Sequence, residues 1–181
     1  MSKFEELCSA YKEYREGLSD VRMASFQFGT KLAYGYIEYL GASDEDFRLE
    51  PLNKVADKNF TYTVPGAMHL DDDAYWHLGF SLTLHISRNT YPKQNLIIDF
   101  MFKPISENVY SVGVLGIDGP FLNVDVNNDK DFEAVYEKIQ DVIKSMYKND
   151  FDYLTGKAHK LTTIGFVQSG IISDLNKDES K

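Results

Sequence analysis

Two histidines of the central segment carry the side chains best suited to acid–base chemistry. His77 and His85 fall on the same side of a predicted strand, where eight residues at about 3.3 Å each separate them by roughly 26 Å. They therefore cannot bind one metal ion together. Either ring could act as a general acid or base, although a histidine on the wetter face of a strand is more often a polar surface residue. His77 is the better candidate, because it lies beside Trp76 and close to the acidic residues 71–73.

The acidic segment that begins at His69 is a second candidate. His69, Asp71, Asp72 and Asp73 offer nitrogen and oxygen ligands, and alternate positions of an extended segment point the same way. The segment lacks the glycine spacing and distal glutamate of a calcium loop, so a solvated acidic turn explains it better. The sequence predicts no metal site and no cofactor.

Nucleophile and phosphate motifs are absent from the sequence. Cys8, the single cysteine, falls on an apolar helical stripe where we expect a buried thiol, and no histidine is near it in the sequence. Gly113, Gly116 and Gly119 fall in a predicted strand and hairpin turn, without the strand-to-helix crossing of a phosphate loop. We therefore predict no catalytic residue, although a site assembled from distant residues would leave no local motif.

The element that must position His77 is a strand with a strict two-residue period. From Trp76 to Ser87 every even position is large and apolar, and every odd position is small or polar. This pattern predicts an antiparallel sheet that is covered on one face. The apolar positions are Trp76, Leu78, Phe80, Leu82, Leu84 and Ile86.

Helical stripes flank the predicted sheet at both ends. Apolar residues recur at three and four positions from Phe4 to Leu40, but one helix of that length would be about 55 Å long, so we expect a break near Gly17. Gly29 and Gly35 suggest close packing of the second helix against another backbone. A second stripe from Asp131 to Lys148 predicts a long C-terminal helix.

The fold class that follows is α+β. We predict a four- to six-stranded antiparallel meander, with two N-terminal helices and one long C-terminal helix packed mainly on one face. A single domain spans 1–173, and the polar tail 174–181 is expected to be disordered. The further strand segments are Phe60–Val64, Ala67–Leu70, Leu96–Lys103, Val109–Ile117, Phe121–Val126 and, more weakly, Leu161–Val167.

The composition disfavours several kinds of partner and cellular location. Nineteen basic against twenty-eight acidic residues give a net charge of −9, which disfavours nucleic acids and anionic membranes as partners. The chain shows no apolar stretch of membrane-spanning length and no basic-then-apolar start typical of a secretory signal. One cysteine fits a reducing compartment, so we expect a cytoplasmic protein.

Two functions fit these observations. The first is a non-enzymatic acidic interaction module, such as an inhibitor, immunity or chaperone-like factor, that binds another protein or itself as a homodimer. Its partner-binding residues would be the apolar ones on the opposite side of their strands from the core: Ile97, Met101, Leu115 and Ile117.

The alternative is a small-molecule-binding or enzymatic domain. It would hold its ligand in a pocket between a curved sheet and the C-terminal helix. Aromatic residues at such positions are more often packed core than pocket wall, so we rank this function second. The pocket would be lined by Trp76, His77, Phe80, Phe100, Phe102 and Tyr136.

Overall fold

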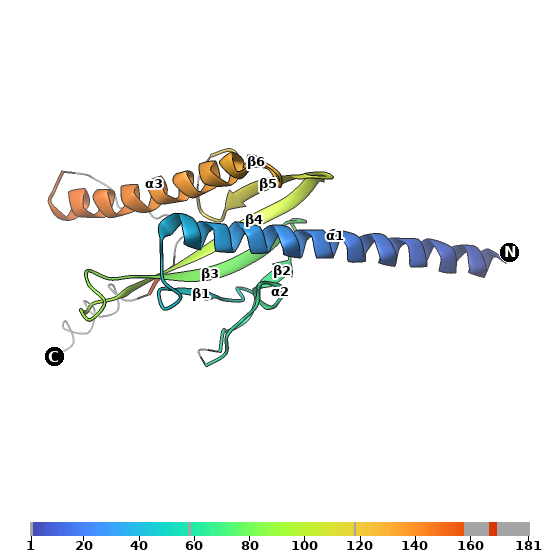
Figure 1. Cartoon of the computed structure of the whole chain (residues 1–181), viewed down its shortest axis with the longest axis horizontal. Helices are drawn as coiled ribbons and strands as arrows, with labels where there is room; N and C mark the ends of the chain where they lie inside the picture. The colour runs from blue at the N-terminus through green and yellow to red at the C-terminus, as the bar shows by residue number, and fades with distance from the viewer. Residues whose placement is uncertain (1, 58, 118, 158–166, 170–181) are drawn as a thin grey trace.

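The computed structural model describes residues 2–57, 59–117, 119–157 and 167–169, and the predicted tail 174–181 and most of the weak strand 161–167 lie outside them (Figure 1). Three helices and seven strands occur in these ranges. Their bounds are α1 (Lys3–Leu40), β1 (Phe47–Leu49), α2 (Val64–Ala67), β2 (Met68–Leu70), β3 (Trp76–Leu84), β4 (Gln94–Ser106), β5 (Val109–Val114), β6 (Leu122–Asp125), α3 (Asp129–Leu154) and β7 (Val167–Ser169).

The N-terminal region is one helix of 38 residues, so the predicted break at Gly17 is wrong. The Ser2 hydroxyl accepts a hydrogen bond from the Glu5 amide in a capping box, and Gly41 ends the helix with φ at 62°. The break was expected because a helix this long exceeds the width of a domain. Figure 1 shows why that limit does not apply: α1 extends far beyond the sheet, and residues 3–24 are almost all exposed.

The sheet is antiparallel throughout, as predicted. Its main order is β1-β3-β4-β5-β6, with β2 also paired to β3 and β7 to β4. The longest ladder joins β3 to β4 and runs from the pair Trp76 and Phe102 to the pair Leu84 and Gln94. This register places the large even-numbered residues of both strands on one face.

One predicted strand, Phe60–Val64, is not formed. Residues 60–63 have no strand pairing, and Val64 begins the short helix α2. Pro65 occupies the first turn of that helix, where its missing amide hydrogen costs nothing. The Pro65-Gly66 pair therefore contributes to a helical turn rather than to a reverse turn after a strand.

The core lies between one face of the sheet and the helices α1 and α3. The rings of Phe80 and Phe100 from the sheet are fully buried, with centroids 5.1 Å apart. Tyr36 from α1 packs on both rings edge to face, at 5.6 and 6.0 Å. From α3, Tyr136 packs on Tyr36 with their centroids 5.4 Å apart. We call this packed unit the body, and it starts at Ser25, the first buried residue of α1.

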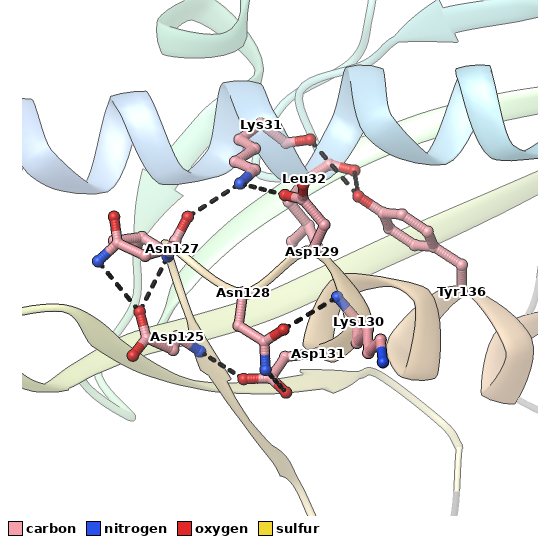
Figure 2. A network of polar contacts seen from close by, with 10 residues as sticks. Lys31, Leu32, Asp125, Asn127, Asn128, Asp129, Lys130, Asp131 and Tyr136 are labelled. Atoms are coloured by element: carbon pink, nitrogen blue, oxygen red, sulfur yellow. Dashed lines mark hydrogen bonds and ion pairs between the residues drawn. The ribbon is translucent and has the colours of Figure 1, made fainter.

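Polar contacts fix α3 against α1 (Figure 2). The Lys31 ammonium donates to the Val126 carbonyl at 2.9 Å and to the Asp129 carboxylate at 2.7 Å. The Tyr136 hydroxyl donates to the Leu32 carbonyl at 3.2 Å. Asn128 caps α3, which begins at Asp129 and continues to Leu154, past the predicted end at Lys148.

Two glycines of α1 permit close packing, Gly35 against α3 and Gly29 against the sheet, but the neighbours are side chains rather than another backbone. A Cβ at Gly35 would collide with the hydroxyl of Tyr136, and one at Gly29 would lie 2.9 Å from the Met68 sulfur. A side chain at either position would therefore have to displace the Met68 or Tyr136 side chain, which glycine avoids. Within the described ranges, no helix combines the length and apolar content needed to cross a bilayer.

Candidate functional site

The outer face of the sheet, opposite α1 and α3, brings three of the four predicted partner-binding residues together. Ile97 and Met101 lie on β4, two positions before and after Asp99. Leu115 follows β5, and its amide donates to the Asp99 carbonyl at 3.0 Å, which places it opposite Asp99. The fourth residue, Ile117, packs instead against the edge of the core. The site is therefore an apolar patch around Asp99.

The carboxylate of Asp99 is bound to a buried histidine. His77 lies on β3 opposite Met101, and its Nδ1 is 2.9 Å from Asp99 Oδ2. On the other side of the ring, Nε2 is 3.3 Å from Asp73 Oδ2. The turn before β3 brings Asp73 into reach, with Ala74 in the left-handed region at φ 63°. The expectation that a carboxylate of this turn approaches His77 holds for Asp73.

Burial and charge have opposite effects on the pKa values in the cluster of His77, Asp99 and Asp73. Burial by itself lowers the pKa of His77, but the hydrogen bonds and charges of Asp99 and Asp73 outweigh it and raise the pKa above its usual value. Burial raises the pKa of Asp99, against the hydrogen bond from His77. The Tyr75 amide and then His77 lower the pKa of Asp73. Both ring nitrogens of His77 face carboxylates, so the arrangement favours an imidazolium held between two anions over a free general base.

Rings from β2 and from two loops cover the edge of the patch. His69 stacks on His77 with centroids 5.2 Å apart, and the Phe121 ring lies over Gly113, where an added Cβ would come within 2.6 Å. Tyr75 packs against Phe121, and the Lys103 ammonium lies 4.5 Å from the Tyr75 ring centroid. Beside the patch the outer face is thus aromatic and carries one cation.

The structure divides the six predicted ligand-binding residues between the two faces of the sheet. Trp76, Phe80, Phe100 and Phe102 point into the core and are 8% exposed or less, and Tyr136 meets them there from α3. His77 points to the outer face. The six side chains therefore do not surround one space.

A groove of about 610 Å³ lies between α1 and α3, on the far side of the helices from these core rings. Tyr34, Gly35 and Tyr39 line it from α1, and Phe132 and Tyr136 from α3. Tyr136 thus borders both the core and this groove. Four of its lining residues are aromatic, and the rest include Glu38, Glu133 and the ion pair of Lys31 with Asp129.

The other candidate residues for metal binding or catalysis, in the segment 69–73 and at His85 and Cys8, form no common site in the described part of the chain. Among the described residues, no three His, Cys, Asp or Glu side chains are arranged to hold a metal ion, and this includes the segment 69–73. His85 is far from His77 and lies 3.1 Å from an Asp46 oxygen. Cys8 is exposed, so the expected buried thiol is wrong, because this part of α1 extends beyond the body.

Asp99 is the residue of the site that sequence reasoning missed. It lies at an odd position of β4, where it appeared as an ordinary polar residue between Ile98 and Phe100. The signal was available only through the pairing of β3 with β4, which puts Asp99 diagonally across from His77. Searches for similar proteins found no matching family model, no matching curated protein and no matching solved structure.

Proposed function

We propose that the protein is a non-enzymatic interaction module that acts in the cytoplasm by binding another protein through the outer-face patch. The observation that carries the proposal is that Ile97, Met101 and Leu115 gather on a sheet face over which neither α1 nor α3 lies. Leu115 is 51% exposed, and the other two are half-buried. Ile117, the fourth predicted residue, packs against the core and is not part of this surface.

The surroundings of the patch support a protein as its ligand. Protein interfaces combine an apolar centre, rich in aromatic residues and methionine, with a polar rim. Met101 and Phe121 supply the first feature, and Lys103 and Asp73 the second. The net charge of −9 favours a partner with a basic surface, and an inhibitor, immunity or chaperone-like factor of this kind would act by covering it.

The test compares the same substitution at two exposed aliphatic residues, Leu115 inside the patch and Ile86 outside it. Leu115→Asp adds a charge at the patch, whereas Ile86→Asp adds one at a residue that is 89% exposed beyond the end of β3. With the chain as bait in an extract of its source cells, we expect Leu115→Asp to lose a captured protein that wild type and Ile86→Asp retain. Both variants should melt like wild type. Equal capture by all three chains would contradict the proposal.

A second candidate function is small-molecule binding in the groove between α1 and α3. The observation that favours it is the lining of Tyr34, Tyr39, Phe132 and Tyr136 around about 610 Å³. This groove lies between two helices, not between the sheet and a helix as expected. Native mass spectrometry of the purified chain should then show a bound compound, which Tyr39→Ala releases. A bare chain of unmodified mass would argue against this function.

A further inference from the structure

The N-terminal half of α1, residues 3–24, which we call the arm, carries an apolar stripe that none of the described residues of the body covers. Its apolar residues alternate in steps of three and four, which is the a and d pattern of a coiled coil. The same steps continue into the body through Ser25, Phe28 and Leu32, which are buried under the sheet. The stripe in the arm consists of Phe4, Leu7, Tyr11, Tyr14, Leu18 and Val21.

The aromatic and leucine side chains of this stripe are largely exposed. Phe4 is 74% exposed, Leu7 69%, Tyr11 64% and Tyr14 62%. Contiguous apolar surfaces of this kind mark interaction sites in monomeric proteins. A helix gains most of its stability from packing of its apolar face, and the arm has no packing of its own. The continuity of the stripe with the core surface of α1 indicates that a second helix covers the arm as the sheet covers the rest.

We infer that two copies of this chain pair through their arms as an antiparallel two-helix coiled coil. The stripe is complementary to itself in that orientation. Phe4 faces Val21 of the partner copy, Leu7 faces the partner's Leu18, and Tyr11 faces the partner's Tyr14. Each of the six apolar positions then has an apolar partner, and the two-fold axis passes between Tyr11 and Tyr14. This surface is separate from the outer-face patch, so the inference goes beyond the proposed function.

The length of the arm fits this pairing. The capping box starts the helix at Lys3, and in the antiparallel register the partner's Lys3 lies beside Arg22. That is three residues before Ser25, where the sheet begins to cover the stripe. The helical part of each arm therefore overlaps the stripe of the other as far as Arg22, outside the part of the stripe that the partner's sheet covers.

A parallel pair does not fit. The sheet lies on the same side of α1 as the stripe, since Phe28 and Leu32 of that stripe are buried against the body. In a parallel pair the continuation of the partner's α1 would have to occupy the space that this sheet fills. In the antiparallel pair the partner's helix runs away from the body, and the two bodies lie at opposite ends (compare the arm in Figure 1).

The flanks of the stripe also suit the antiparallel orientation. One flank carries Ala10, Gly17 and Ala24 at seven-residue spacing, and antiparallel pairing brings Ala10 next to the partner's Gly17. Small residues there let the two helices approach closely. The other flank places Arg15 opposite the partner's Cys8, so no two like charges face each other across that flank.

The area available is sufficient for a specific dimer. An aromatic side chain offers about 150–250 Å², so the six rings of two arms, each more than half exposed, bury about 600–1,000 Å². Leu7, Leu18, Val21 and the stems of flanking residues add to this. A biological interface should exceed about 1,000 Å² in total.

The first test is the mass of the full chain in solution, measured by light scattering over a dilution series. We expect twice the 20.7 kDa chain mass for wild type. Tyr11→Asp, which places a charge in the seam, should give a monomer. Ser9→Asp, which places the same charge on the outer side of the arm, and Leu115→Asp, which alters the patch of the proposed function, should remain dimeric. A wild-type monomer, or a dimer that Tyr11→Asp does not dissociate, would overturn the inference.

Disulfide trapping tests the orientation in a Cys8→Ser background. Chains with Leu7→Cys and chains with Leu18→Cys are oxidised separately and as a mixture. In the antiparallel pair only the mixture should crosslink, because the two Leu7 positions are about 16 Å apart along the axis. Crosslinking of Leu7→Cys chains with one another would show a parallel pair and would also overturn the inference. None of these results bears on capture of another protein at Leu115, so the two proposals can fail independently.

Discussion

Asp99 is the residue on which the electrostatics of the outer face depends. Asp99→Asn keeps the shape of the side chain and removes its charge. We expect the pKa of His77, which is raised above 6.5 in the wild-type protein, to fall, because burial then acts against Asp73 alone. NMR titration of the imidazole signals measures this shift. Asp71→Asn, an exposed residue of the same turn, is the control and should leave the pKa of His77 in place. An unchanged pKa in Asp99→Asn would show that the contact is not formed in solution.

The same cluster predicts a pH dependence of stability. A folded-state pKa that is raised for His77 means that its ion pairs contribute fully below pH 6.5, and that this contribution is lost as the pH rises through the folded-state pKa. His77→Gln should therefore be most destabilising near pH 6, by about 3 to 5 kcal/mol, since it leaves Asp99 buried and unpaired. Urea unfolding at pH 6 and pH 9 should show a smaller difference from wild type at the higher pH. An equal difference at both values would contradict the assignment.

Among the elements, α1 contains glycines in two different environments: Gly35 is closely packed, and Gly17 is exposed to open space. Gly35 lies against Tyr136, so Gly35→Ala should displace that ring and break its hydrogen bond to the Leu32 carbonyl. Gly17 has nothing within 4 Å of its added Cβ, so Gly17→Ala should stabilise the helix of the unpaired arm by about 1 kcal/mol.

Chemical denaturation in the monomeric Tyr11→Asp background separates the two effects. We expect Gly35→Ala to lower the free energy of unfolding by about 1 to 3 kcal/mol, as overpacking does. Gly17→Ala should raise the helical circular dichroism signal without lowering the unfolding midpoint. If both substitutions acted in the same direction, the close approach of Tyr136 to α1 would be wrong.

The elements that sequence reasoning predicted well are those with an unambiguous period. The alternation in β3 predicted the strand and its buried face correctly up to Leu84. Ile86 continues the pattern but lies beyond the end of the strand and is exposed. The pattern alone cannot say where the neighbouring strand stops. The predicted break at Gly17 was wrong for a related reason. The period indicates that one face of the helix is apolar, but it does not indicate whether the same chain covers that face.

The alternation of side chains along the strands also made part of the candidate site predictable. Ile97, Met101 and Leu115 lie on one face of the sheet because side chains that alternate in paired strands share a face, whereas their role in binding a partner stays a prediction. The position of Asp99 beside His77 depends on the register of β3 against β4, which local residues do not determine. Ile117 differs because the chain turns after Leu115, with Gly116 at φ 78° and the Ile117 amide bonded to the Val114 carbonyl, so the two-residue period no longer applies to it.

At the scale of the whole molecule, the structure is a body from which the exposed helical arm extends. A chain that begins at Ser19 lacks most of the arm but keeps every buried residue of α1, from Ser25 onward. We expect this chain to fold, to remain monomeric, and to melt at a temperature that does not depend on its concentration. The full chain should melt at a higher temperature as its concentration rises, because pairing of the arms stabilises the folded state by mass action. Scanning calorimetry at two concentrations tenfold apart measures both behaviours. Loss of folding in the shortened chain would mean that the arm packs on the body, whereas a concentration-dependent melting temperature in that chain would place the dimer contact outside the arm.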